Sequence, residues 1–184
     1  MKNKPQLPQI NSLTKKAESK LFTIEQLELT FSNKEERTYE RIKGGGRGAV
    51  MVVPFADDET ILLVREYCAG THSYELGFPK GLIDEGETPA IAANRELKEE
   101  IFYGSHCLEP VLEVMLVPSF FNAKMYIYTA RELYEEALPG DEPEPLEVVK
   151  WPLKNYQELL QQPDFNEARS IAALMLVIDQ WKSK

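Results

Sequence analysis

The stretch GLIDEGETPAIAANRELKEEIF, from Gly81 to Phe102, combines a loop with a strongly predicted helix. Thr88 is a suitable N-cap residue. Pro89 fits the first helical position, because the N–H group that proline lacks has no partner there. Strong helix formers fill the run from Ala90 to Ile101. We therefore predict a tight loop at Gly81 and a helix that begins near Pro89.

This predicted helix gathers three carboxylates on one side. At about 100° per residue, Glu96 and Glu100 lie nearly on one line, and Glu99 lies within about 60° of them. The apolar residues form a different stripe that can pack on a sheet: Ala90, Ala93, Leu97 and Ile101. Taken alone, the acidic side is either a solvated face, softened by an Arg95–Glu99 pair, or the wall of a cleft.

The chain before the loop predicts an N-terminal extension. Residues 1–20 are polar and are expected to form a loosely held arm. Apolar residues then alternate from Phe22 to Phe31, with a change of phase near Gln26 that suggests a bulge, and a second strand follows over 37–42. These strands are expected to form a β-hairpin. The three glycines at 44–46 are either a hinge or a loop that approaches a ligand closely.

The remaining sequence predicts one α/β domain. Strands are expected at 49–55, 60–67, 74–78, 110–117, 124–130 and 146–151, and two further helices at 155–162 and 167–181. Mixed strands with helices outside them indicate an α/β/α sandwich with a mixed sheet. The expected organisation is therefore an arm and hairpin over 1–46 and a main domain over 47–184.

Composition limits the partners. The chain has 184 residues and a formal net charge of −9, which argues against nonspecific binding to nucleic acid or anionic lipid. Its apolar runs are far shorter than the roughly 20 residues of a membrane span, so we expect a cytoplasmic location. We assign no chemistry to the residues that lack motif spacing, namely Cys68, Cys107, His72 and His106.

The spacing around the acidic side resembles the Nudix box. That pattern is a glycine, a glutamate, Arg-Glu, an apolar residue and Glu-Glu, here Gly81, Glu87, Arg95, Glu96, Leu97, Glu99 and Glu100. The resemblance implies a metal-dependent hydrolase that acts on a phosphorus-containing anhydride, the diphosphate of a nucleoside diphosphate linked to another group. It also implies that Glu87 and Arg95 pair and hold the loop against the helix.

The same resemblance implies a set of metal ligands. Glu96 and Glu100 become the principal ligands, Glu99 a further ligand directly or through water, and the backbone carbonyl of Lys80 or Gly81 another. Hard oxygen ligands suit Mg²⁺ or Mn²⁺. Such an ion would also offset the repulsion between neighbouring carboxylates.

One position departs from the box pattern. The family has a glycine where this chain has Phe102, and a bulky residue rarely adopts the left-handed conformation that ends many helices. We therefore expect the helix to run on to Gly104 or to end differently. No implied metal ligand is lost.

Nearly the whole chain, from Leu21 to Trp181, resembles the ADP-compounds hydrolases of the NudE type, relatives of ADP-ribose pyrophosphatases. The stretches that carry this are LFTIEQLELTFSN, TYERIK, SYELGFPKGLIDEGE, PSFFNAKM, GDEPEPL and PDFNEAR. The resemblance implies cleavage of ADP-ribose, NADH or diadenosine polyphosphates to AMP and a phosphorylated product. It also implies a homodimer in which the N-terminal hairpin of one subunit helps to build the site of the other.

Several residues are candidates for substrate binding. Arg41, Arg47 and Arg65 suit phosphate contact, although each is equally well a surface charge. Tyr39 is a candidate for stacking on adenine or for the dimer core, and Glu40 for a hydrogen bond to the base. Glu75 is a candidate for contact with ribose or with metal-bound water.

The general base has three candidates. Related pyrophosphatases take a glutamate from a loop far from the box, and the segment GDEPEP at 140–145 reads as such a loop, with Glu142 ahead of Glu144. Glu99 competes with both. The main alternative to an enzyme is a catalytically silent sensor that binds ADP-ribose-like ligands, and the third reading is an interaction domain whose acidic helix is only solvated.

Overall fold

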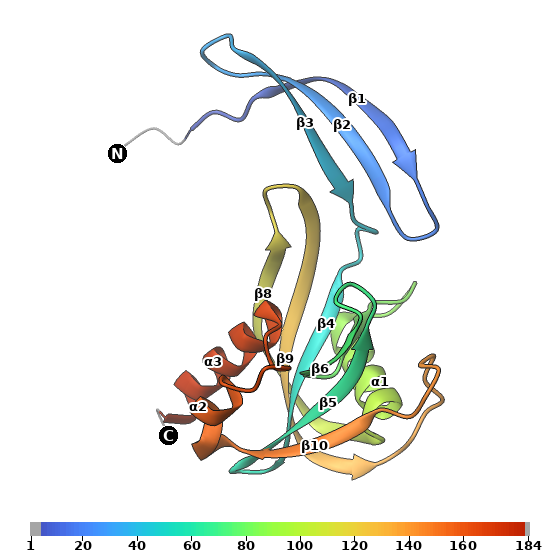
Figure 1. Ribbon diagram of the computed structural model, residues 1–184, viewed down its shortest axis with the longest axis vertical. Coiled ribbons are helices and arrows are strands. Elements are labelled where there is room, and N and C mark those ends of the chain that lie inside the picture. Colours follow the sequence, from blue (N-terminus) through green and yellow to red (C-terminus); the bar gives the residue numbers. More distant parts are fainter. Residues whose placement is uncertain (1–4, 183–184) are drawn as a thin grey trace. The chain divides into compact units, whose positions relative to one another are not determined.

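The computed structural model describes residues 5–182, and the chain divides into two compact units. One unit comprises the chain up to Gly46 together with Met115–Lys124, and the other comprises Arg47–Val114 and Met125–Lys184. The N-terminal unit therefore includes a segment from outside the range 1–46. Figure 1 shows the elements of both units.

The N-terminal unit is built on three antiparallel strands, β1 (Gln9–Glu18), β2 (Thr23–Thr30) and β3 (Glu36–Lys43). The predicted hairpin of β2 and β3 is confirmed. The predicted bulge near Gln26 is wrong, because the β2–β3 register continues unbroken from Thr23↔Lys43 to Thr30↔Glu36. The change of phase has another cause: Ile24 lies on an exposed face, whereas Glu25 and Leu27 are buried on the other.

The expectation of a loose arm is also wrong where β1 forms. Nearly all side chains of β1 are exposed, and the strand is held by its backbone pairing with β2. An edge strand of this kind needs no alternation of apolar residues, so the sequence pattern does not reveal it. Residues 1–4 of the predicted arm lie outside the described residues.

The second unit contains a mixed sheet centred on β4 (Ala49–Asp57). This strand runs parallel to β9 (Phe121–Glu135) and antiparallel to β5 (Thr60–Cys68). The other strands extend the sheet: β10 (Glu147–Pro152) and β6 (Ser73–Gly77) pair with β5, β7 (Lys80–Leu82) with β4, and β8 (Tyr103–Val117) with β9. All the predicted strands of this unit are present, β8 and β9 are longer than expected, and β7 was not predicted.

Helices cover the two faces of this sheet (Figure 1). Helix α1 (Pro89–Glu100) lies on one face, where Val50 and Val52 join Ala93 and Leu97 in one buried cluster. Neighbouring residues of a strand point to opposite faces, and Met51 and Val53 are also fully buried, on the side of α3 (Ala168–Lys182). The expected α/β/α sandwich is confirmed.

The helix predicted over 155–162 is shorter than expected. It consists of the 3₁₀ turn η1 (Leu153–Asn155) and a single turn, α2 (Tyr156–Leu159). The backbone then tightens, with Gln161 N–H bonded to Glu158 O at 3.1 Å, as the chain approaches Pro163. Within residues 5–182, no helix combines the length and apolar character that crossing a bilayer requires.

Candidate active site

The acidic side of α1 is buried. Thr88 caps the helix as predicted, since its Oγ1 accepts a hydrogen bond from Ile91 N–H at 3.3 Å. Glu96 and Glu100 are only 7% and 5% exposed, although glutamate is an ionisable side chain that is rarely buried. A solvated face would leave such side chains in water. The reading of this side as a merely solvated face is therefore wrong for Glu96 and Glu100.

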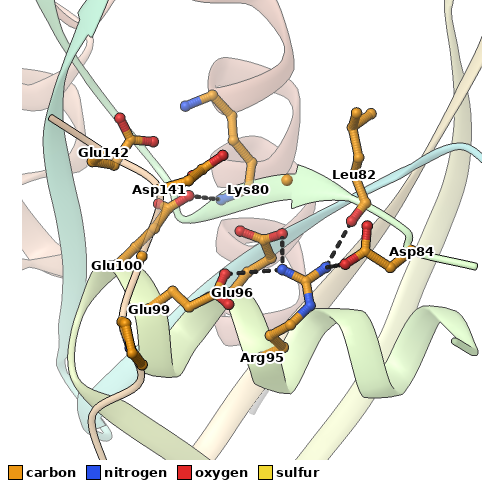
Figure 2. A pocket seen from close by; sticks show the side chains of 12 residues that line it. Lys80, Leu82, Asp84, Arg95, Glu96, Glu99, Glu100, Asp141 and Glu142 are labelled. Atoms are coloured by element: carbon orange, nitrogen blue, oxygen red, sulfur yellow. Dashed lines mark hydrogen bonds and ion pairs between the residues drawn. The ribbon is translucent and has the colours of Figure 1, made fainter.

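These carboxylates line a cavity of about 490 Å³ between α1, β7 and the segment 139–142. Figure 2 shows the side chains of the residues that line it. The lining residues are Lys80, Gly81, Leu82, Asp84, Arg95, Glu96, Glu99, Glu100, Pro139, Gly140, Asp141 and Glu142. The candidate metal ligands and one loop glutamate thus share one concave site.

Gly81 lets the loop approach the helix closely. A Cβ atom at this position would lie 2.0 Å from Glu96 Oε1, far inside van der Waals contact. The loop therefore passes directly over the Glu96 carboxylate only because residue 81 has no side chain.

Arg95 ties the loop to the helix and organises the acidic wall (Figure 2). Its Nε donates to Glu87 Oε1 at 2.9 Å and its Nη2 to Glu87 Oε2 at 3.0 Å, so the expected pair forms in a two-pronged geometry. Nη1 donates to Glu96 Oε1 at 2.7 Å and to Glu99 Oε2 at 2.9 Å. The same guanidinium thus fixes the loop and positions two of the three carboxylates on the acidic side of α1.

Burial changes the acidity of the two buried carboxyls. Desolvation raises the pKa of Glu96 to about 7, although Arg95 lowers it in part. Desolvation also raises the pKa of Glu100 well above its usual value, with Lys80 acting in the opposite direction. Among the described residues, Glu100 Oε2 is buried with no hydrogen-bond partner, while Oε1 accepts from Lys80 N–H at 3.3 Å.

These features fit a divalent cation. Within residues 5–182, no three acidic, histidine or cysteine side chains are already gathered as a complete metal cage, and Arg95 holds oxygens of Glu96 and Glu99. The unpartnered Glu100 oxygen is nevertheless left free to bind a cation, and Glu96 and Glu99 lie on the same wall. Such hard oxygen donors are what Mg²⁺ and Mn²⁺ bind.

The loop glutamates differ in position. Glu142 lines the cavity, and burial together with the charges of Glu66 and Asp141 raises its pKa. Glu144 is not part of the lining, and it accepts a hydrogen bond from Tyr74 Oη. Glu99 lines the cavity but is bonded to Arg95. Of the three base candidates, Glu142 is the one that lines the cavity and has no hydrogen bond to Arg95.

The candidate substrate-binding residues belong to separate places. Tyr39, Glu40 and Arg41 lie on β3 of the N-terminal unit, where Arg41 Nε and Nη2 both donate to Glu25 Oε2, at 3.0 and 2.8 Å. Tyr39 is 48% exposed, beside Phe31.

The other candidates lie in the second unit but outside the cavity lining. Arg47 donates to Ile83 O at 3.0 Å, and Arg65 pairs with Glu147 and Asp164. Glu75 Oε1 accepts from Ser73 Oγ at 2.5 Å. Clustering of the three predicted arginines stays a prediction.

The end of α1 differs from the expectation. The helix stops at Glu100, and Phe102 takes the left-handed conformation with φ of 66°, so the expectation that a bulky residue would avoid it is wrong. The following strand explains this, because Phe102 O accepts from Glu136 N–H at 3.1 Å and the chain must turn directly into β8. The box geometry is kept at the cost of some backbone strain.

The structure also places residues that the motif did not identify. The side chain of Lys80 lines the cavity and pairs with Glu66 of β5, and Asp84 and Asp141 also line it. Burial alone would lower the pKa of Lys80, but the nearby carboxyls of Glu66 and Glu100 more than offset this and raise it. Adjacency to Gly81 was a signal for Lys80, whereas nothing in the sequence pattern points to Glu66.

Comparison with known proteins agrees with this geometry. The NUDIX domain model matches residues 46–174, and the model of the NudE-type Nudix hydrolase N-terminal domain matches residues 8–41. The chain is 51% identical to the ADP compounds hydrolase NudE of Escherichia coli (strain K12), over 97% of this chain and 96% of the relative. It is 28% identical to an ADP-ribose pyrophosphatase of Bacillus subtilis (strain 168), over 69% of this chain and 70% of the relative.

A solved structure gives the same picture. A crystal structure of an ADP compounds hydrolase matches with a TM-score of 0.94 and 50% identity, covering 98% of this chain and 97% of that chain. The two family models match consecutive parts of the chain, and the Nudix box lies within the part that the NUDIX model matches. The chain belongs to the Nudix hydrolase family and, within it, to the proteins with a NudE-type N-terminal domain.

Proposed function

We propose that the chain is a metal-dependent hydrolase that cleaves the pyrophosphate bond of ADP-linked compounds. ADP-ribose, NADH and diadenosine polyphosphates are the substrate candidates, and the products are AMP and a second phosphorylated compound. Mg²⁺ is the proposed ion, with Mn²⁺ as a substitute. The names of the relatives with 51% and 28% identity support the substrate class.

One observation carries this proposal. Glu96 and Glu100 are almost fully buried, Glu96 lies directly beside Gly81, and Glu100 Oε2 is left without a hydrogen-bond partner among the described residues. A buried unpaired carboxylate oxygen is costly unless a ligand satisfies it. If this helix had only a structural role, replacing the Glu100 side chain with an apolar one would stabilise the protein.

The residues of the chain have distinct roles in the proposed reaction. Glu96 and Glu100 would hold the ion, with Glu99 and the carbonyl of Lys80 or Gly81 as further donors. When bound there, a divalent ion supplies charge neutralisation for the diphosphate and acidifies water. Arg95 keeps Glu96 and Glu99 in place.

Glu142 is the proposed general base. It takes a proton from the water whose oxygen attacks phosphorus, and the P–O bond of the bridging oxygen breaks to release AMP and the second phosphorylated product. A raised pKa makes a carboxylate a better proton acceptor, and burial raises that of Glu142.

The experiment is a product analysis with purified protein and Mg²⁺. ADP-ribose, NADH, diadenosine triphosphate and ADP-glucose are incubated separately, with a chelator in the control. Release of AMP that the chelator abolishes is the expected result. Metal-dependent binding without turnover of any compound would overturn the proposal in favour of a sensor.

We further propose a cytoplasmic homodimer in which the N-terminal unit helps to form the partner's site through Tyr39, Glu40 and Arg41. The surface of this unit supports dimerisation, since Ile10, Leu13 and Phe22 are each about half exposed. Light scattering should give twice the chain mass of 21.0 kDa. A monomer mass at working concentrations would contradict this.

The net charge of −9 favours small substrates over nucleic acid.

A further inference from the structure

The cavity has two positively charged side chains among its described lining residues, Arg95 and Lys80. The guanidinium nitrogens of Arg95 all donate to groups of the protein. Its nitrogens donate to Glu87, Glu96 and Glu99, and Nη2 also donates to Leu82 O at 2.8 Å. Of these two cations, Lys80 is therefore the one whose side chain does not hold the glutamates of the Nudix box.

The structure holds Lys80 in a defined place. Its backbone belongs to β7, paired with Met51 of β4, and its ammonium group forms an ion pair with Glu66. The side chains of Lys80 and Glu66 are 17% and 24% exposed. In Figure 2 the side chain of Lys80 extends away from α1 and ends on the side of the cavity where Glu142 lies.

The charges of the cavity suggest a role for the Lys80 ammonium group beyond its ion pair with Glu66. The cavity is also lined by six carboxylate side chains, Asp84, Glu96, Glu99, Glu100, Asp141 and Glu142. Ions held at α1 would neutralise a diphosphate from one side only. A lysine ammonium has three donors and acts as a point charge toward phosphate, so it can donate one hydrogen bond to Glu66 and another to a phosphate oxygen.

We propose that Lys80 Nζ binds a diphosphate oxygen of the substrate, with Glu66 as the positioning residue that directs the ammonium group into the cavity. This inference rests on the proposed hydrolysis of ADP-linked compounds. It adds a phosphate-binding cation that comes from β7 and differs from Arg41, Arg47 and Arg65.

Steady-state kinetics with ADP-ribose and saturating Mg²⁺ test the proposal. Lys80→Met keeps the apolar stem and removes the charge, and KM should rise roughly tenfold, as expected for the loss of a hydrogen bond to a charged group. The value of kcat should stay within about threefold, because the contact exists before and during the reaction. Glu66→Gln keeps the ammonium but not its partner, and should raise KM less.

The double variant Lys80→Met/Glu66→Gln separates substrate binding from a purely structural ion pair. It removes the Glu66 carboxylate that Lys80→Met would leave without its cation, so it should stay folded even if Lys80→Met does not. We expect its KM to be as high as that of Lys80→Met. Lys98→Met is the matched control, because Lys98 is also paired, with Glu136, and its side chain is 18% exposed, but it is not part of the lining.

A wild-type KM in the double variant would overturn the inference, since Lys80 would then only neutralise Glu66. A fall in kcat at constant KM would also overturn it, by placing Lys80 in the chemical step. Absence of turnover by the wild-type protein would contradict the proposed function itself. These failures are therefore distinguishable.

Discussion

The side chain of Glu96 leaves no room for a side chain at Gly81. The added methyl group of Gly81→Ala would meet the buried carboxylate at 2.0 Å and displace it from Arg95. We expect kcat/KM to fall by about 100-fold, which corresponds to the loss of about 3 kcal/mol of transition-state stabilisation. The melting temperature should change little.

Turnover and thermal denaturation measure these two effects. Gly45→Ala is the matched control, because a Cβ there meets nothing within 4 Å. Equal loss of activity in both variants would contradict the steric explanation.

The buried carboxyls predict an unusual dependence of stability on pH. The pKa of Glu96 is raised to about 7 by burial, and that of Glu100 is raised in the same direction, so folding favours their protonated forms. This contribution is fully present below the unfolded value of about 4.5 and is lost as pH rises through the folded pKa. Without metal, the free energy of unfolding should therefore decrease between pH 5.5 and 7.5.

Urea denaturation in a chelator checks this prediction. The window lies above the range in which the lowered pKa values of Glu87 and Glu25 matter, since both groups are ionised there when folded and unfolded. Glu96→Gln should flatten the decrease. An equal slope in wild type and variant would show that Glu96 is not the source.

At the scale of elements, α1 ends at a residue that the sequence makes unexpected. Phe102 adopts φ of 66°, which costs a non-glycine residue roughly 1–2 kcal/mol. Phe102→Gly should relieve this strain and raise the melting temperature by about 2–4 °C, with turnover little changed. Lys34→Gly, at an exposed turn with φ of 72°, is the control without an aromatic ring.

A lower melting temperature for Phe102→Gly alone would show that contacts of the ring outweigh the strain. Circular dichroism at rising temperature is sufficient for the comparison.

Elements with local signals were predictable from the sequence. The start of α1 depends on Thr88 and Pro89, which act within one turn, and the box spacing identified the acidic wall. The strand β1 and the pair Lys80–Glu66 were not predictable, because the first depends on backbone pairing with another strand and the second joins β7 to β5. Contacts between distant segments leave no periodic pattern in either one.

At the scale of the whole molecule, an acidic protein is proposed to bind an acidic substrate. The formal charge of −9 and the carboxylates of the cavity would repel a diphosphate unless cations lie between them. Divalent ions at Glu96 and Glu100 and the ammonium group of Lys80 would supply these cations. We therefore expect hydrolysis to depend on the buried carboxylates of Glu96 and Glu100.

The most direct test is AMP release from ADP-ribose by wild type and Glu100→Gln in Mg²⁺. Glu100→Gln keeps the size of the buried side chain and removes its charge, so kcat/KM should fall at least about 100-fold in a folded protein. Glu109→Gln, at an exposed position of β8, should be unchanged. Wild-type turnover by folded Glu100→Gln would contradict the account.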